Sequence, residues 1–243
     1  MTKASNEKGI PVHTHTFGNV AVRNTVSAFI KAQNEVNNGT RNTMAHVRNV
    51  LPEDYKRIAD NHIAVAENIN WGSPVTEKFV KLIEQVKGIP GKLVVEGYPV
   101  KSLLDHGVVV GSSTDAPAAS GMPTDVFGIV EMAVDRASLG WTDGIPEANK
   151  GAFKIVGYTG NSLKVEDVLN MYECVPVKTA LDIMTIGGAR LIRTDHTRGS
   201  IEVGKSADFI IVDKNVLNCP TNEIHKARTM KVYYDGELVY ERK

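Results

Sequence analysis

Two histidines near the start of the chain, His13 and His15, stand two residues apart in an apolar, strand-like stretch. Residues two apart in a strand project from the same face, so both imidazoles would point the same way. Further along, His46 ends a second apolar run, and Asp115 follows the run 107–111. Imidazoles hold a divalent ion such as zinc, the ion acidifies a bound water, and a nearby carboxylate accepts and returns the proton. These residue types therefore favour a metal enzyme.

The spacing of three of these residues suggests that they meet. His46 lies about one strand–helix unit after His15, and Asp115 lies about two further units after His46. The carboxyl ends of parallel strands form one rim of a β/α barrel, so the three side chains can converge there although they are distant in sequence. Two simpler interpretations stay open: a buried structural histidine at position 46, and an Asx turn at Asp115 before Pro117.

Apolar β-rich runs alternate with helical patterns along most of the chain. This alternation predicts a parallel sheet, either open or closed into a barrel. The predicted strands cover residues 10–16, 41–47, 63–66 and 107–111. The predicted helices cover 19–37, 52–59, 76–86, a short segment at 103–104, 125–138, 164–173 and 177–190, with a loop over 140–163.

The pattern changes near residue 198. Residues 199–213 and 230–240 have no helical period. Asp235 and Gly236 stand between two β-prone runs, and Asp-Gly in that position is a strong signal for a hairpin. We therefore predict two parts, a β/α domain over 1–198 and a small β appendage over 199–243.

Composition narrows the class of protein. The chain has 28 basic and 28 acidic residues, so no overall field attracts nucleic acid or anionic lipid, and neither is an expected partner. Cys174 and Cys219 are too few and too far apart for a disulfide framework or a cysteine zinc cluster, which fits a reducing compartment. No apolar run approaches membrane-spanning length. We expect a soluble cytoplasmic protein.

Four segments, in order along the chain, carry a family resemblance. They are His15-Thr-Phe-Gly-Asn, then Met44-Ala-His46-Val, then Tyr98-Pro-Val-Lys-Ser-Leu-Leu-Asp-His-Gly107 running into Gly111-Ser-Ser-Thr-Asp115-Ala-Pro117, and finally Gly199-Ser-Ile-Glu-Val-Gly-Lys-Ser-Ala-Asp208. The set resembles the amidohydrolase superfamily, most closely its amidohydrolase-3 subgroup, and it covers nearly the whole chain.

The resemblance implies a role for each matching residue. His15 resembles the histidine that ends the fifth barrel strand and His46 the one that ends the sixth, and both are metal ligands in the family. Asp115 resembles the eighth-strand aspartate, which sits at the metal and acts as general base and acid. His13 has no firm counterpart and is expected one layer lower in the barrel, in a supporting place that Lys101 could share. The implied cofactor is a divalent metal, zinc first, and no other cofactor is expected.

The same resemblance implies a hydrolase that acts on non-peptide carbon–nitrogen bonds of a small amide-like or cyclic amide substrate. Departures from the family pattern qualify this expectation. The family's own His-x-His comes from the first strand, after an N-terminal β segment, and a bridging lysine or similar residue comes from the fourth. Neither has a counterpart here, and only about thirty residues separate His15 from His46. Two local differences are Asn19, where an acidic residue is usual, and Val47-Arg48, where a small residue and glutamine are common.

The chain therefore resembles the C-terminal half of the family pattern. The expected fold is α/β: a partial TIM-type barrel corresponding to strands 5–8, truncated from a fold that takes about 250 residues, plus part of a composite β-sandwich domain. Half a barrel has two unpaired strand edges and an exposed apolar interior, so we do not expect a stable monomer.

Two hypotheses of different class stay open. The first is half of a metal-dependent hydrolase that is active only when the missing N-terminal half is supplied, so that the isolated chain is inactive. The second is a non-catalytic half-barrel relic or assembly subunit, which pairs with itself as a homo-oligomer or with a partner chain. Metal content and amidase activity, together with the effect of His46→Ala, separate them.

Overall fold

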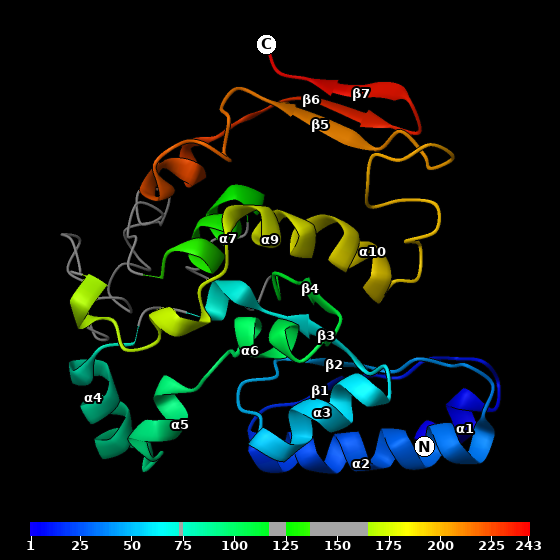
Figure 1. Cartoon of the computed structure of the whole chain (residues 1–243), viewed down its shortest axis with the longest axis vertical. Helices are drawn as coiled ribbons and strands as arrows, with labels where there is room; N and C mark the ends of the chain where they lie inside the picture. Colours follow the sequence, from blue (N-terminus) through cyan, green and yellow to red (C-terminus); the bar gives the residue numbers. More distant parts are fainter. Residues whose placement is uncertain (73–74, 117–124, 137–164) are drawn as a thin grey trace.

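Four short parallel strands form the sheet that carries the residues of interest (Figure 1). The computed structural model describes residues 1–72, 75–116, 125–136 and 165–243. The strands lie in the order β1-β2-β3-β4, so each pairs with its predecessor in the chain. Helices connect the successive strands, as parallel pairing requires. Their bounds are β1 (His13–His15), β2 (Thr43–Ala45), β3 (Ala64–Glu67) and β4 (Val110–Ser112).

The helices follow the predicted alternation closely. Figure 1 shows α2 and α3 at one end of the molecule, with α7, α9 and α10 between the parallel sheet and the second sheet. Within the described residues the α-helices are α1 (Thr2–Asn6), α2 (Asn19–Val36), α3 (Pro52–Asp60), α4 (Glu77–Lys87), α5 (Gly91–Val95), α6 (Val100–Asp105), α7 (Val126–Val134), α9 (Val177–Asp182) and α10 (Gly188–Leu191). The 3-10 and π segments are η1 (Ile69–Trp71), η3 (Val165–Asp167), η4 (Met171–Glu173), η5 (Ile183–Gly187) and η6 (Thr221–Lys226).

Local signals determine where several helices begin and end. Pro52 occupies the first turn of α3, where its missing N–H costs nothing. The Thr76 side chain caps α4 by accepting a hydrogen bond from the Phe79 N–H at 3.2 Å. Asn37 ends α2 and Gly88 ends α4, each in the left-handed conformation. The sequence predictions for these helices are confirmed.

Several predicted elements differ from the observed ones. β1 is shorter than the predicted strand 10–16, and α7 ends at Val134, before the end of the predicted helix 125–138. The predicted helix 164–173 is wrong: only the 3-10 turns η3 and η4 form there. Leu169 N–H donates instead to the Val75 carbonyl at 2.7 Å, and Val75 N–H donates to the Asn170 side chain at 3.0 Å. This pairing with a distant segment replaces the helical bonds.

The fourth strand begins at Val110, later than predicted. Gly107, at φ 79°, and Val108, whose N–H donates to the Leu103 carbonyl at 3.1 Å, close the end of α6 instead. Pro117, the last two residues of the predicted helix 125–138 and the whole predicted loop 140–163 lie outside the described residues.

A single apolar core joins the sheet to its helices. Phe29 of α2, Met44 of β2 and Ile58 of α3 are buried in one cluster with Leu103 of α6 and Ile129 of α7. The helix 177–191 continues through a π segment and presents Gly187 to the carbonyl of Val110, where a β-carbon would clash. None of the helices in the described ranges has the length and apolar character needed to cross a lipid bilayer.

A second, antiparallel sheet follows near the C-terminus. It contains β5 (Phe209–Val212), β6 (Thr229–Tyr234) and β7 (Glu237–Glu241) in that order. Asp235, at φ 50°, and Gly236, at φ 82°, form the tight turn between β6 and β7. The predicted hairpin is confirmed.

Candidate metal centre

The structure brings His15, His46 and Asp115 together at the carboxyl edge of the parallel sheet. His15 ends β1 and pairs in register with Ala45, the last residue of β2, so His46 emerges beside it. The two imidazole centroids lie 4.5 Å apart. Asp115 follows β4, and its Oδ1 atom lies 3.8 Å from Nε2 of His46. Residues from three strand ends, distant in sequence, thus share one neighbourhood.

Two of these three residues have a strained backbone. His46 has a φ of 57° and Asp115 a φ of 55°, both in the left-handed region. Such a conformation costs a residue with a side chain on the order of 1–3 kcal/mol and is concentrated at functional sites. Tyr98, at φ 57°, shares the strain, and the charge of Asp115 reaches its hydroxyl. Away from the candidate centre, the same left-handed conformation has a structural role: Asn37 ends helix α2, and Asp235 forms part of a tight turn.

The surroundings favour the neutral form of His46. Burial lowers the pKa of its imidazole, the Asp115 carboxylate raises that pKa, and His15 and His13 lower it further. A neutral imidazole has a nitrogen lone pair that can bind a metal ion or accept a proton. Only 14% of the His46 side chain is exposed, whereas 32% of Asp115 is exposed, so the carboxylate is the more accessible of the two.

The two residues expected in supporting places lie differently. His13, the first residue of β1, is solvent-exposed and close enough for its charge to act on His46. Lys101 lies on α6 and forms an ion pair with Asp105 one turn along the helix, with nearly half of its side chain exposed. The structure therefore places Lys101 in a surface ion pair and does not join it to His15, His46 or Asp115.

The donor set suits zinc by chemical type but is not assembled around an ion. Two imidazoles and a carboxylate are ligands that zinc takes at catalytic sites. Over the described ranges, however, no group of three or more His, Cys, Asp or Glu side chains is arranged closely enough to hold a metal ion. The chain thus supplies suitable donors without a closed coordination site.

A buried carboxylate at the neighbouring strand end was not singled out from the sequence. Glu67 ends β3 and is fully buried, and burial raises its pKa to about 8 despite a hydrogen bond from the Asn68 N–H and the nearby Arg136 guanidinium. Its Oε2 atom and Nη1 of Arg136 have no hydrogen-bond partner among the described residues. The sequence signal that could have identified Glu67 is its position directly after the predicted strand 63–66, at a strand end like His46.

An arginine and two aromatic rings flank the three central residues. Phe17 stacks beside His15, with ring centroids 6.4 Å apart. The guanidinium carbon of Arg48 lies 5.3 Å from the centroid of the Phe17 ring and 5.9 Å from that of Tyr98. This places a cation next to the candidate centre, two residues after His46.

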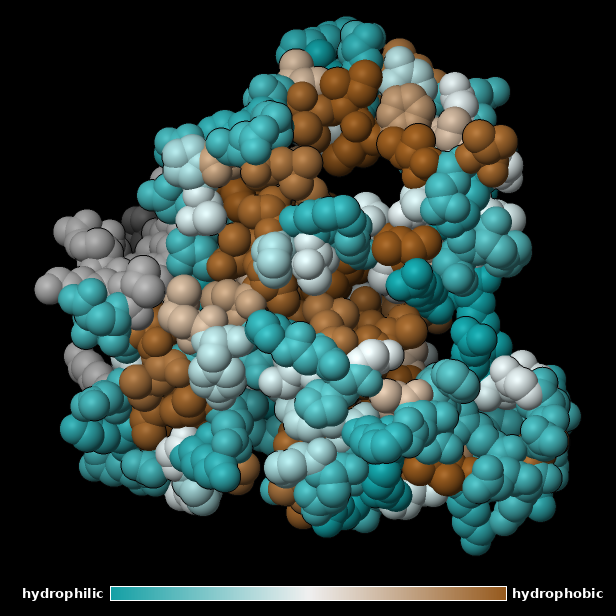
Figure 2. All heavy atoms as spheres, viewed as in Figure 1, coloured by the Kyte–Doolittle hydropathy of each residue, from teal (hydrophilic) through white to brown (hydrophobic). Residues whose placement is uncertain are grey.

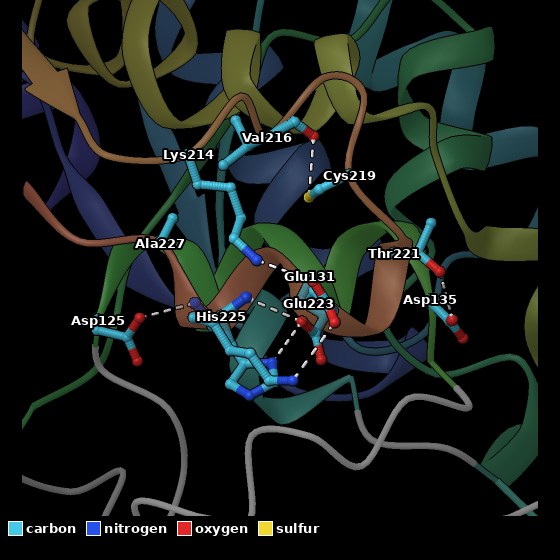
Figure 3. Close-up of polar contacts among 12 residues, drawn as sticks. Asp125, Glu131, Asp135, Lys214, Val216, Cys219, Thr221, Glu223, His225 and Ala227 are labelled. Atoms are coloured by element: carbon cyan, nitrogen blue, oxygen red, sulfur yellow. Dashed lines mark hydrogen bonds and ion pairs between the residues drawn. The ribbon is translucent and has the colours of Figure 1, made fainter.

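A second polar cluster joins α7 to η6 (Figure 3). The fully buried Glu131 carboxylate accepts a hydrogen bond from the His225 N–H at 2.9 Å, and the same oxygen lies 2.7 Å from the His225 Nδ1 atom. Thr221 donates to Asp135 at 2.9 Å beside it. This cluster anchors the segment between β5 and β6 to the helical layer.

Comparison with known proteins gives a consistent family match. The model of the Amidohydrolase family matches residues 1–240. N-substituted formamide deformylase of Arthrobacter pascens is 25% identical over 242 residues, covering 98% of this chain and 38% of that protein. The 5-methylthioadenosine/S-adenosylhomocysteine deaminase of Caldanaerobacter subterraneus is 26% identical over 166 residues, covering 65% of this chain and 32% of that protein.

Solved structures share the fold. A metal-dependent hydrolase from Pyrococcus horikoshii has a TM-score of 0.63 at 20% identity, over 91% of this chain and 39% of that one. An adenosine deaminase from Xanthomonas campestris with bound zinc has a TM-score of 0.57 at 19% identity, over 97% of this chain and 46% of that one. The chain spans about 40% of the length of the curated relatives that it matches end to end.

Proposed function

Since this chain belongs to the amidohydrolase family, we propose that it forms the metal-binding and proton-transferring half of a hydrolase that cleaves carbon–nitrogen bonds other than peptide bonds. The observation that carries the proposal is the convergence of His15, His46 and Asp115 from three parallel strand ends. The relatives named as a deformylase and a deaminase also support action on small amide-like or amidine-like molecules.

Each of the three residues has a distinct task. His15 and His46 would offer imidazole nitrogens to a divalent ion, for which zinc is the best match to the donors. When bound, such an ion lowers the pKa of water and polarises a carbonyl group. Asp115, the most accessible carboxylate beside His46, accepts the proton of the attacking water and later delivers it to the leaving nitrogen. His13 adds positive charge near His46 when it is protonated.

We further propose that the four parallel strands are consecutive strands of a β/α barrel, with residues 1–198 as barrel and 199–243 as accessory β domain. The sequential order of the strands, with helices in every connection, supports this arrangement. Within the described residues β1 and β4 are each paired on one side only. Coverage of about 40% of the relatives' length agrees with half of such a barrel.

A second polypeptide part would complete both the sheet and the metal site. The relatives' uncovered portion, or a second copy of this chain, could supply it. Apolar side chains on the small sheet are exposed on both faces: Ile210, Ile211, Leu238, Val239 and Tyr240. Figure 2 shows hydrophobic residues along an opening between this sheet and the helices beneath it. Exposed apolar surface of this kind is commonly an interaction surface.

A non-catalytic role is the second candidate. A half-barrel relic or assembly subunit would keep these surfaces for pairing and would need no metal. The lack of an assembled group of metal ligands in the described part of the chain favours this alternative.

Metal titration with cobalt(II), whose visible spectrum reports coordination, separates the two candidates. The wild-type chain is titrated alone and mixed with the N-terminal portion of a relative, and hydrolysis of N-formyl and N-acetyl amines is followed in parallel. We expect His15→Ala and His46→Ala to weaken cobalt binding at least about tenfold, because each removes a ligand. His196→Ala, at an exposed histidine outside the site, is the matched control. A wild-type chain that binds no divalent metal in either mixture contradicts the hydrolase proposal.

A further inference from the structure

Arg48 occupies a defined place beside the candidate centre. It follows His46 by two residues in the segment that leaves β2, and its backbone carbonyl accepts a hydrogen bond from the Tyr98 N–H at 2.8 Å. Phe17 holds the corresponding place after β1, two residues beyond His15. The segments leaving adjacent site strands therefore meet at the Arg48 side chain.

Two aromatic rings hold the guanidinium group. Its central carbon lies 5.3 Å from the Phe17 ring centroid and 5.9 Å from the Tyr98 ring centroid. Contacts of a guanidinium with aromatic rings restrict its orientation and leave its N–H groups free to donate hydrogen bonds. The rings thus orient the guanidinium group for a ligand and leave its positive charge unpaired.

The charge of Arg48 is not balanced by a direct partner in the described ranges. Arg23 and Arg57 both pair with Asp54, and Arg198 pairs with Asp208. Within the described residues the Arg48 guanidinium lies over the Phe17 and Tyr98 rings and beside Gly97, and no carboxylate there pairs with it. The side chain is only partly exposed. A half-buried cation without an ion pair is suited to bind an anion from outside the chain.

We infer that Arg48 selects substrates that carry a carboxylate. The planar fork of N–H groups matches a carboxylate in a bidentate manner, and Phe17 and Tyr98 provide apolar walls around it. The same Phe17 ring also lies beside His15, with 6.4 Å between ring centroids, so a substrate whose carboxylate binds Arg48 would have its amide near the candidate centre. The preferred substrate class is an N-acyl or N-formyl amino acid rather than a neutral amide. The hydrolysis of such a substrate rests on the proposed function, whereas binding of its carboxylate to Arg48 does not.

Binding to the metal-free full-length chain tests the inference separately from catalysis. The probes are N-acetylglycine and its neutral counterpart N-acetylglycinamide, titrated in the presence of a chelator and followed by NMR. We expect the wild-type chain to bind the acid at least about tenfold more tightly than the amide, the order of one charge-assisted bidentate contact. Arg48→Gln should abolish this preference, and Arg48→Lys should retain part of it because the charge remains without the fork.

Arg41→Gln is the matched control. Arg41 precedes the same strand, β2, at its opposite end, so the substitution makes the same change in net charge away from the site. Circular dichroism and thermal unfolding of each variant verify the fold. A wild-type chain that binds both probes equally or binds neither overturns the inference, as does an Arg48→Gln variant that is folded and keeps the preference. Loss of metal binding would instead overturn the proposed hydrolase function and leave the anion preference measurable.

Discussion

Two histidine–carboxylate pairs lie within the described part of the chain, and their geometry differs. In the pair between α7 and η6, the fully buried Glu131 oxygen lies 2.7 Å from His225 Nδ1 and also accepts the His225 backbone N–H (Figure 3). At the sheet edge, His46 and Asp115 are 3.8 Å apart, beyond hydrogen-bond distance, and both have a left-handed backbone. The hydrogen-bonded pair Glu131–His225 therefore holds two segments of the fold together. His46 and Asp115, which are not hydrogen-bonded to each other, remain able to bind other ligands.

Asp115→Asn should have the largest effect at the sheet edge. We expect a loss of hydrolytic rate of about 10²–10⁴-fold in the assembly in which the wild-type chain is active, because the amide cannot accept the proton of water. The free energy of unfolding should change little, since 3.8 Å is too long for a strong bond to be lost. Steady-state kinetics and chemical denaturation measure the two quantities. Comparable activity in the variant would show that Asp115 is not the general base.

Glu131→Ala should produce the opposite pattern. Removing this carboxylate leaves the His225 N–H groups without their acceptor and opens a cavity under η6, so we expect a loss of about 2–4 kcal/mol in the free energy of unfolding. Cobalt affinity should remain within about twofold of the wild type, because no candidate ligand is altered. Urea denaturation and cobalt titration give these values. An unchanged free energy of unfolding in this variant would show that the Glu131–His225 pair does not stabilise the fold.

Glu67→Gln tests whether burial at the strand end is as costly as the structure indicates. The folded pKa of about 8 exceeds the ordinary 4.5, so between these pH values the folded chain holds a proton that the unfolded chain releases. Stability conferred by this group is therefore present below pH 4.5 and falls as the pH rises to 8. From this difference in pKa, we expect the free energy of unfolding of Glu67→Gln to exceed that of the wild type by up to about 4 kcal/mol at pH 8, with little difference at pH 4.5. Equal pH profiles for both proteins would contradict this expectation.

His46→Gly should give the smallest effect on stability. Glycine adopts a φ of 57° without steric cost, but it has greater freedom in the unfolded chain. The net change should be a gain of about 0.5–1 kcal/mol or less, together with loss of cobalt binding. Comparing the thermal unfolding of His46→Gly with that of His46→Ala measures how much backbone strain glycine relieves, because alanine also removes the imidazole but keeps the strain. If the alanine variant is more stable than the glycine variant by about 0.4–1 kcal/mol, the difference expected from unfolded-chain entropy alone, the backbone at position 46 is not strained.

Local sequence patterns predicted most of the elements. The helices predicted over 19–37, 52–59 and 76–86 and the Asp235–Gly236 turn depend on neighbouring residues, and the structure confirms them. The predicted helix 164–173 failed because residues 169 and 170 bond to Val75, which no local pattern reveals. The family prediction is confirmed, since the family model spans residues 1–240.

The sequence alone determined which residues could do chemistry and that strand-end positions would carry them, because strand period and strand–helix spacing are local properties. Tertiary structure alone decided that His15, His46 and Asp115 lie within one neighbourhood. It also decided that Glu67 is fully buried and that Arg48 rests against two rings without a carboxylate partner in the described ranges. Burial, charge balance and ring contacts depend on segments brought together only by folding, so they cannot be derived from spacing along the chain.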